Sequence, residues 1–138
     1  GDVTCHGPGQ AVGYPILRLQ EKERDVKKLI ERLEEIMIRT ASDFLVEARR
    51  IPGLRGIWVG DKKIGAVGVR ISQWTTTHGF ALNVSNDLSA FESMVPCGIQ
   101  GCAVTSLERI LGASPAMSSV WDRIARHAAV VLERGAHA

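Results

Sequence analysis

The sequence predicts an α+β fold in which a mixed or antiparallel sheet packs against helices. Three observations favour this class: a long amphipathic helix pattern in the first third of the chain, short apolar runs in hairpin order in the middle, and a second amphipathic pattern near the end. Strand candidates that follow one another as hairpins, instead of alternating with helices, argue against a doubly wound parallel sheet.

The first predicted elements are a strand and a long helix. Residues 10–19 have the composition of a strand, and Pro15 within them favours the edge of a sheet or the end of a strand. From residue 21 the apolar positions recur at steps of three and four, which predicts an amphipathic helix of roughly five turns. We expect this helix to run to residue 37, with residues 41–45 as an extension. Its apolar positions are Val26, Leu29, Ile30, Leu33, Ile36 and Met37.

The middle of the chain predicts strands. Residues 46–51 suggest a short strand that Pro52-Gly53 ends. The apolar runs 56–59 and 63–71 are separated by Gly60-Asp61-Lys62, which predicts a hairpin. Residues 77–84 predict one more strand, closed by the polar residues 85–87.

The remaining elements are helices with recognisable caps. Asp87 is suited to cap a short helix over residues 88–94, and Thr105-Ser106 to cap one over residues 107–111. Residues 118–133 predict a final amphipathic helix. Its inward positions are expected at Val120, Ile124, His127, Val130 and Val131.

Composition excludes several classes of protein. The 138 residues fit one domain, and 45% hydrophobic composition excludes a fully disordered chain. Seventeen basic and fifteen acidic side chains give a net charge of +2, which favours neither nucleic acid nor an anionic membrane as a partner. The sequence has no apolar run of transmembrane length and no secretory signal pattern. Three cysteines, an odd count, favour a reducing, cytoplasmic setting over a disulfide framework.

The chain opens on a glycine-rich stretch, residues 1–10, without a methionine. A backbone that needs so many glycines is usually held from both sides, so we expect the natural protein to begin further upstream. The stretch lacks the Gly-Lys-Ser/Thr of a P-loop and the strand and helix that flank a dinucleotide fingerprint. A close passage of the backbone past a ligand or a strand is the simpler interpretation.

Cys97 is the cysteine whose neighbours suggest chemistry. Pro96 and Gly98 favour a sharp turn in which the N–H groups of Cys97 and Gly98 face one point, as an oxyanion hole requires. An ordinary tight turn is the alternative, and the local sequence alone favours it. The cysteines lack the paired ligand spacing of zinc sites, and Cys5 and Cys102 are interpreted as small buried side chains.

A nucleophilic cysteine needs a cation or base beside it, because a free thiol is mostly protonated at neutral pH. The candidates are His6, His78 and Lys63. Lys63 begins an apolar run whose small residues leave room for a ligand, but a lysine at a hairpin is usually solvated. From the residues alone, a histidine is the favoured partner.

Five ordered motifs resemble one known family. They are Asp2-Val3-Thr4-Cys5-His6-Gly7-Pro8-Gly9-Gln10 with Val12-Gly13-Tyr14-Pro15, Gly56-Ile57-Trp58-Val59, Lys63-Ile64-Gly65-Ala66-Val67-Gly68, His78-Gly79-Phe80-Ala81-Leu82-Asn83 and Pro96-Cys97-Gly98-Ile99. Together they resemble the lipoyl(octanoyl) transferases of lipoate biosynthesis, over nearly the whole chain. The resemblance implies the α+β catalytic domain that this family shares with biotin and lipoate protein ligases.

The resemblance also implies site residues. It makes Cys97 the nucleophile and Lys63, instead of a histidine, its partner, with the oxyanion held at Cys97 and Gly98. Substrate-binding positions are implied at Gly1, Asp2, Val3, Thr4, Cys5, His6, Ala66, Val67, Gly68, Gly79, Phe80 and Ala81.

The implied reaction moves an octanoyl group from octanoyl-acyl carrier protein, through a cysteine thioester, to a lysine of a lipoyl domain. The implied acceptors are the lipoyl domains of 2-oxoacid dehydrogenases and the glycine cleavage H protein. No cofactor and no metal is expected, because the donor thioester is already activated. Two alternatives stay open: an ATP-dependent lipoate or biotin ligase, and a non-catalytic module that binds lipoyl domains.

The chain departs from the family pattern in two places. Cys5 stands where the family usually has tyrosine, and the Arg-Gly pair that normally precedes Gly1 is absent. Residues 1–138 are therefore expected to be a single octanoyltransferase catalytic domain that lacks its N-terminal part.

Overall fold

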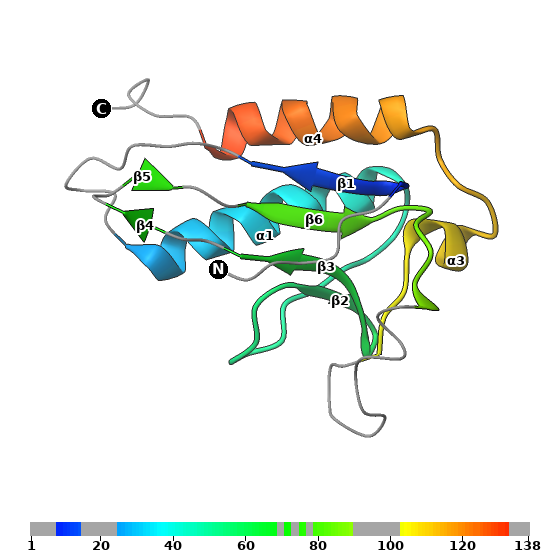
Figure 1. The fold of residues 1–138 in the computed structure, drawn as a ribbon, viewed down its shortest axis with the longest axis horizontal. Coiled ribbons are helices and arrows are strands. Elements are labelled where there is room, and N and C mark those ends of the chain that lie inside the picture. The colour runs from blue at the N-terminus through cyan, green and yellow to red at the C-terminus, as the bar shows by residue number, and fades with distance from the viewer. Residues whose placement is uncertain are drawn as a thin grey trace.

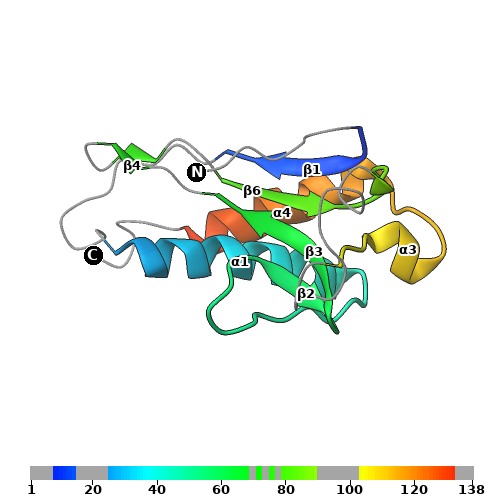
Figure 2. The same cartoon turned by 60° about the horizontal axis from the view of Figure 1, so that its bottom comes forward.

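The computed structural model describes residues 8–14, 25–68, 71–72, 75–76, 79–89 and 103–132. One sheet forms a layer, and the two long helices lie side by side beneath one of its faces (Figures 1 and 2). This is the α+β arrangement that the sequence predicts. The elements are β1 (Gln10–Gly13), α1 (Val26–Asp43), β2 (Ile57–Val59), β3 (Lys62–Val67), β4 (Ile71–Ser72), β5 (Thr75–Thr76), β6 (Phe80–Asn83), α3 (Leu107–Leu111) and α4 (Met117–Val131).

The main sheet has the strand order β1-β6-β3-β2, and neighbouring strands in it are antiparallel. Within the described residues β1 pairs only with β6, so it is an edge strand, as Pro15 predicts. β2 and β3 form the predicted hairpin, which turns at Gly60 and Asp61. A parallel bridge between Lys63 and Val104 makes the sheet mixed at one end.

α1 is the long helix that the apolar periodicity predicts. Asp25 caps its first turn, since its side chain accepts the N–H of Lys28 at 3.1 Å. The helix ends in a Schellman arrangement in which the N–H of Val46 bonds to the carbonyl of Ala41 at 3.0 Å. Leu45 holds the left-handed position of this motif with φ of +64°, although its side chain is 93% exposed.

α3 and α4 follow the predicted caps and periodicity. Ser106 caps α3, its Oγ accepting the N–H of Arg109 at 3.2 Å. α4 buries Val120 and Ile124 against the rest of the core. Val130 is 62% exposed, so its expected inward position is wrong, because the buried stripe of α4 is narrower than the apolar pattern.

The core lies between the sheet and the helices. It joins one face of α1, the inward residues of β1, β3 and β6, and the buried side of α4. Its fully buried members include Leu33, Ile36, Met37, Ile57, Ile64, Leu82, Val84, Leu107 and Val120.

Two predicted strands differ from those observed. Residues 46–51 form no strand, and only Arg49 pairs, exchanging two 2.8 Å hydrogen bonds with Trp58. The next residue, Arg50, contacts α1 through its guanidinium. Within the predicted strand 77–84, β6 spans Phe80–Asn83, and the carbonyl of Gly9 accepts the N–H groups of Val84 and Ser85 just after it.

Other predictions fall partly outside the described residues. Residues 90–94 of the predicted helix 88–94 lie outside them, while Asp87 accepts the N–H of Ser89 at 2.9 Å as a cap does. The run 63–71 is represented by β3 and the start of β4, and β5 was not anticipated. Among the helices that the structure describes, none has the length and apolarity to span a bilayer.

Candidate active site

An irregularity in the sheet sets the direction of Lys63. Ile57 pairs with Gly65 and Trp58 pairs with Lys63, so one step on β2 matches two steps on β3, with Ile64 as the extra residue. Such a bulge re-aims the side chains on either side of it. Ile57 and Gly65 face α1, since a methyl group added at Gly65 would lie 2.7 Å from Met37 Sδ. Lys63 therefore lies with Trp58 on the opposite face.

The backbone of Lys63 pairs with residues 103–105 along the edge of β3 that faces β6, beyond the last residue paired with β6. Its N–H donates to the carbonyl of Ala103 at 2.7 Å, and its carbonyl accepts the N–H of Thr105 at 2.9 Å. Two hydrogen bonds to one short run fix the strand position of Lys63 relative to residues 103–105.

The side chain of Lys63 is half-buried against an aromatic ring and a glycine. Nζ lies 5.3 Å from the centroid of the Trp58 ring, which is cation–π distance. A methyl group added at Gly56 would lie 2.6 Å from Lys63 Cε. Burial lowers the pKa of the Lys63 amine below its ordinary value of 10.5, and the nearby charge of Glu34 raises that pKa in part. A buried amine of this kind is suited to acid–base work.

Six substrate-binding candidates lie in β3, in β6 and in the residues next to these strands, on neighbouring rungs. Ala66 pairs with Ala81 and Val67 pairs with Phe80, and the N–H of Gly68 donates to the carbonyl of Gly79 at 2.9 Å. The pairing divides them between two faces. Phe80 belongs to the core on the helix side, and Ala66 and Ala81 face away from it.

The other predicted site residues lie outside the described residues. They are Gly1, Asp2, Val3, Thr4, Cys5, His6, His78, Cys97, Gly98 and Cys102. Their roles stay predictions, and the pairing of Cys97 with Lys63 is among them.

Sequence reasoning missed a cluster of buried amides beside this site. Asn83 Oδ1 accepts from Gln10 Nε2 at 3.0 Å and from Asn86 Nδ2 at 3.2 Å, and Asn83 Nδ2 donates to the carbonyl of Thr105 at 3.1 Å. Gln10 Oε1 and Asn86 Oδ1 are buried and have no hydrogen-bond partner among the residues that the structure describes. The cluster ties β1 and β6 to the run that holds Lys63.

Sequence reasoning also missed a buried carboxylate. Glu34 is 4% exposed in the middle of α1, with one oxygen 3.1 Å from Arg50 Nε and the other accepting the N–H of Gly56 at 2.9 Å. The available signal was its position, one turn after Ile30 and one turn before Met37 on the apolar stripe.

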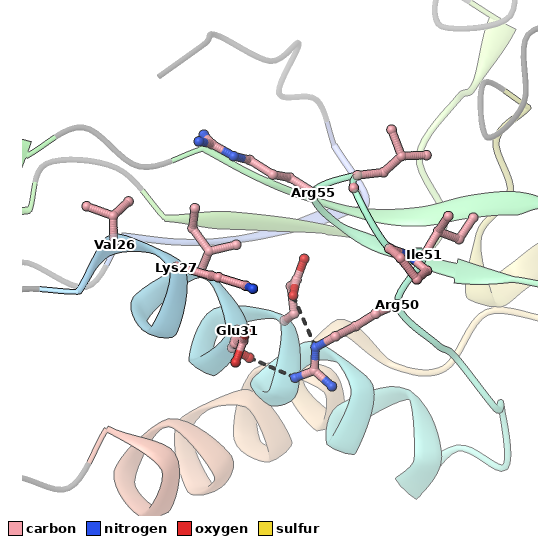
Figure 3. A pocket seen from close by; sticks show the side chains of 11 residues that line it. Val26, Lys27, Glu31, Arg50, Ile51 and Arg55 are labelled. Atoms are coloured by element: carbon pink, nitrogen blue, oxygen red, sulfur yellow. Dashed lines mark hydrogen bonds and ion pairs between the residues drawn. The ribbon is translucent and has the colours of Figure 1, made fainter.

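A pocket of about 640 Å³ opens beside this carboxylate (Figure 3). Arg50 reaches from its loop to α1, where Nη2 donates to the carbonyl of Glu31 at 2.9 Å. Lys63 is not part of the wall. The lining residues are Val26, Lys27, Ile30, Glu31, Glu34, Arg50, Ile51, Pro52, Gly53, Leu54 and Arg55.

A family model described as the lipoyl protein ligase A/B catalytic domain matches residues 1–129. The chain belongs to this family. Its motifs and its ligase-like fold thus agree with the resemblance found in the sequence.

Curated relatives carry a more specific name. The octanoyltransferase of Solibacter usitatus is 51% identical over 133 residues, covering 96% of this chain and 60% of that protein. The octanoyltransferase of Pelobacter propionicus is 49% identical over 125 residues, covering 91% of this chain and 60% of that protein. The chain thus spans about 60% of the length of these two relatives.

Solved structures confirm the expected fold. Biotin protein ligase from Aquifex aeolicus, in complex with biotin and ATP, has a TM-score of 0.71 at 15% identity, over 91% of this chain and 51% of that one. Lipoate-protein ligase A bound with ATP has a TM-score of 0.63 at 17% identity, over 78% of this chain and 47% of that one. At these identities the likeness establishes the fold alone.

Proposed function

We propose that this chain carries the chemistry of an octanoyltransferase with Cys97 as nucleophile and Lys63 as its partner. The donor is octanoyl-acyl carrier protein, and the acceptor is a lysine on a lipoyl domain of a 2-oxoacid dehydrogenase or of the glycine cleavage H protein. The proposed setting is the cytoplasm, where Cys97 stays reduced. The relatives named octanoyltransferase support this activity.

The observation that carries the proposal is the environment of Lys63. The side-chain amine of Lys63 is half-buried and its pKa is lowered. The backbone of Lys63 is hydrogen-bonded to Ala103 and Thr105. Ala103 follows Cys97 by six residues, a span of at most about 22 Å. The chain therefore has the length to bring the thiol to the amine.

In the first half-reaction the Cys97 thiolate attacks the carbonyl carbon of the octanoyl thioester. Lys63 promotes thiolate formation, as a nearby cation or as the base that takes the thiol proton. The N–H groups of Cys97 and Gly98 hold the oxyanion of the tetrahedral intermediate. The bond to the carrier sulfur then breaks, the carrier leaves as its thiol, and the octanoyl group stays on Cys97.

In the second half-reaction the lysine amine of the lipoyl domain attacks the new thioester. The attacking amine gives up a proton, which neutral Lys63 accepts. The bond to Cys97 sulfur breaks and an amide forms. Because an amide is more stable than a thioester, this step makes the transfer run forward.

The octanoyl chain needs an apolar slot. Burying six methylenes contributes roughly 5 kcal/mol, at about 0.8 kcal/mol each. Ala66 and Ala81 pair on the face away from the helices, and their small side chains leave room there. The proposed substrate-binding set also includes Gly68, Gly79 and residues 1–6. Val67 and Phe80 belong to it through their backbones, because their side chains pack against the core on the helix side. A dry slot also protects the thioester from water.

Ligation with ATP is the second candidate. Structural neighbours whose descriptions name biotin or lipoate ligases with ATP support it. A ligase activates a free acid and does not need Cys97, so the two functions differ in their requirement for this thiol.

Intact-mass spectrometry after mixing with octanoyl-acyl carrier protein tests the proposal. We expect an octanoyl adduct on Cys97 in this chain, or in this chain preceded by the upstream segment that the resemblance implies. Lys63→Ala should slow its formation, whereas Lys62→Ala, at the exposed lysine next to it, should not. A folded protein that forms no adduct, or a Cys97→Ser protein that ligates lipoate with ATP, would exclude the transferase.

A further inference from the structure

We propose that Glu34 is a positioning residue for Lys63, acting from the opposite side of the sheet through the backbone of Gly56. The inference deepens the proposed function and rests on it for the role of Lys63. Its structural part, the control of Lys63 by Glu34, stands on contacts within the described residues.

The first step is the anchoring of Glu34. A buried carboxylate is costly unless both oxygens find partners. Oε1 lies 3.1 Å from Arg50 Nε, and Oε2 accepts the N–H of Gly56 at 2.9 Å. Arg50 is held in turn by the carbonyl of Glu31 and by Glu35 Oε1 at 3.2 Å. The carboxylate therefore fixes the backbone just before β2.

The second step leads from Gly56 to Lys63. Gly56 has φ of +124°, which a side chain rarely tolerates, and it lies against the end of the lysine. A methyl group there would be 2.6 Å from Lys63 Cε and 3.4 Å from Nζ. The amine is thus confined between Gly56 and the Trp58 ring, 5.3 Å from the ring centroid. Moving the Gly56 backbone would move the amine.

The third step is electrostatic. Among the described residues around Lys63, α1 supplies the charge of Glu34, β2 supplies the Trp58 ring, and residues 103–105 hydrogen-bond its backbone. Glu34 raises the pKa of Lys63 against the larger opposite effect of burial. Loss of that charge is therefore expected to lower the pKa of Lys63 further.

The experiment follows the ¹³Cε resonance of Lys63, assigned by its loss in Lys63→Ala, through a pH titration. Glu34→Gln should move the titration midpoint to lower pH. Glu35→Gln is the matched control, because Glu35 also pairs with Arg50 but makes no bond to Gly56. Gly56→Ala keeps every charge and should change the ring-current shift that Trp58 imposes on Cε.

Octanoyl transfer to Cys97 is measured on the same proteins. We expect Glu34→Gln and Gly56→Ala to slow it by between about tenfold and a hundredfold, with Glu35→Gln unchanged. Circular dichroism verifies that each variant is folded. If Glu34→Gln does not fold, the Lys63 resonance and the acylation rate of Gly56→Ala alone test the positioning role.

The outcomes separate the two proposals. If the wild type is acylated in a Lys63-dependent way, but neither the resonance nor the rate responds to Glu34→Gln or Gly56→Ala, the positioning role is wrong and the transferase stands. If no variant and no wild type is acylated while the resonance responds as expected, the transferase is wrong and the control of Lys63 by Glu34 stands.

Discussion

Lys63 sits where a lysine is unfavourable for stability. Its cation is half-buried, and desolvation lowers its pKa. Lys63→Met keeps the length of the side chain and removes the buried charge, so we expect a gain of about 1 kcal/mol in stability at neutral pH. The same variant should lose octanoyl transfer. Urea unfolding with a parallel adduct assay checks both, and a Lys63→Met protein less stable than wild type would contradict the reasoning.

The pH dependence of this gain has a definite sign. Below the folded pKa of Lys63 both folded and unfolded states carry the cation, and the desolvation penalty is complete. As pH rises through the lowered folded pKa toward 10.5, the folded state loses its proton first and the penalty is relieved. The stability difference between Lys63→Met and wild type should therefore narrow at alkaline pH. Unfolding curves from neutral pH to about pH 10 measure it; a constant difference would count against a buried cation.

Leu45 is a second residue in an unfavourable state. It has φ of +64° at the end of α1, and its side chain is 93% exposed. A left-handed conformation costs an L-residue about 1–2 kcal/mol, and glycine is free of this cost. Leu45→Gly should therefore stabilise the protein by about 1 kcal/mol and raise Tm by a few degrees. Leu45→Ala keeps its Cβ and should give no such gain. Thermal unfolding compares the two.

Some functional residues could be predicted from the sequence and others could not. Pro96 and Gly98 single out Cys97 from the local sequence, but Lys63 is preferred as its partner only when five motifs are compared with a known family, because residue chemistry alone favours a histidine. Glu34 resembled any charge on an amphipathic helix. Its importance depends on Arg50 and Gly56, which are 16 and 22 residues away along the chain. Local pattern carries no information about such contacts.

At the scale of elements, the cap of α3 matters beyond α3. Ser106 is 2% exposed and follows the run that holds the backbone of Lys63. Ser106→Ala leaves the N–H of Arg109 without its acceptor, so we expect a loss of about 1 kcal/mol. Ser114→Ala is the control, because this exposed hydroxyl donates only to the carbonyl of Pro115. Equal effects of the two variants in thermal unfolding would contradict the cap.

Elements with strong periodicity were predicted well. The helix patterns gave α1, α3 and α4, and the turn at Gly60 and Asp61 gave the hairpin of β2 and β3. Residues 46–51 were mistaken for a strand because an extended segment with one bridging residue has the same composition. The predicted end of the strand 77–84 lies one residue beyond the end of β6 at Asn83.

At the scale of the whole molecule, one face of the sheet packs on the helices, and the octanoyl slot is proposed on the other. Leu82 is fully buried on the helix side, so Leu82→Ala should cost about 2–5 kcal/mol of stability. Under conditions in which the Leu82→Ala protein is folded, its preference for octanoyl over shorter acyl groups should equal that of the wild type. Denaturant unfolding gives the loss, and a shift in preference would place Leu82 near the substrate instead.

Ala66 lies on the other face, where the octanoyl slot is proposed. Ala66→Leu adds three carbons there, so transfer of an eight-carbon acyl group should fall by at least about tenfold. A four-carbon donor should be used nearly as well as before. Competition between the two donors, followed by intact mass, gives the ratio. An unchanged ratio would exclude Ala66 from the slot.

The bulge at Ile64 has an implication for redesign. A regular hairpin of β2 and β3 that kept every residue would pair Trp58 with Ile64 instead of Lys63. Strict alternation from Gly65 would then place Lys63 on the face toward α1, away from the proposed acyl slot. A redesign that straightens the sheet for stability should therefore keep this bulge, because it sets the face on which the proposed partner of Cys97 lies.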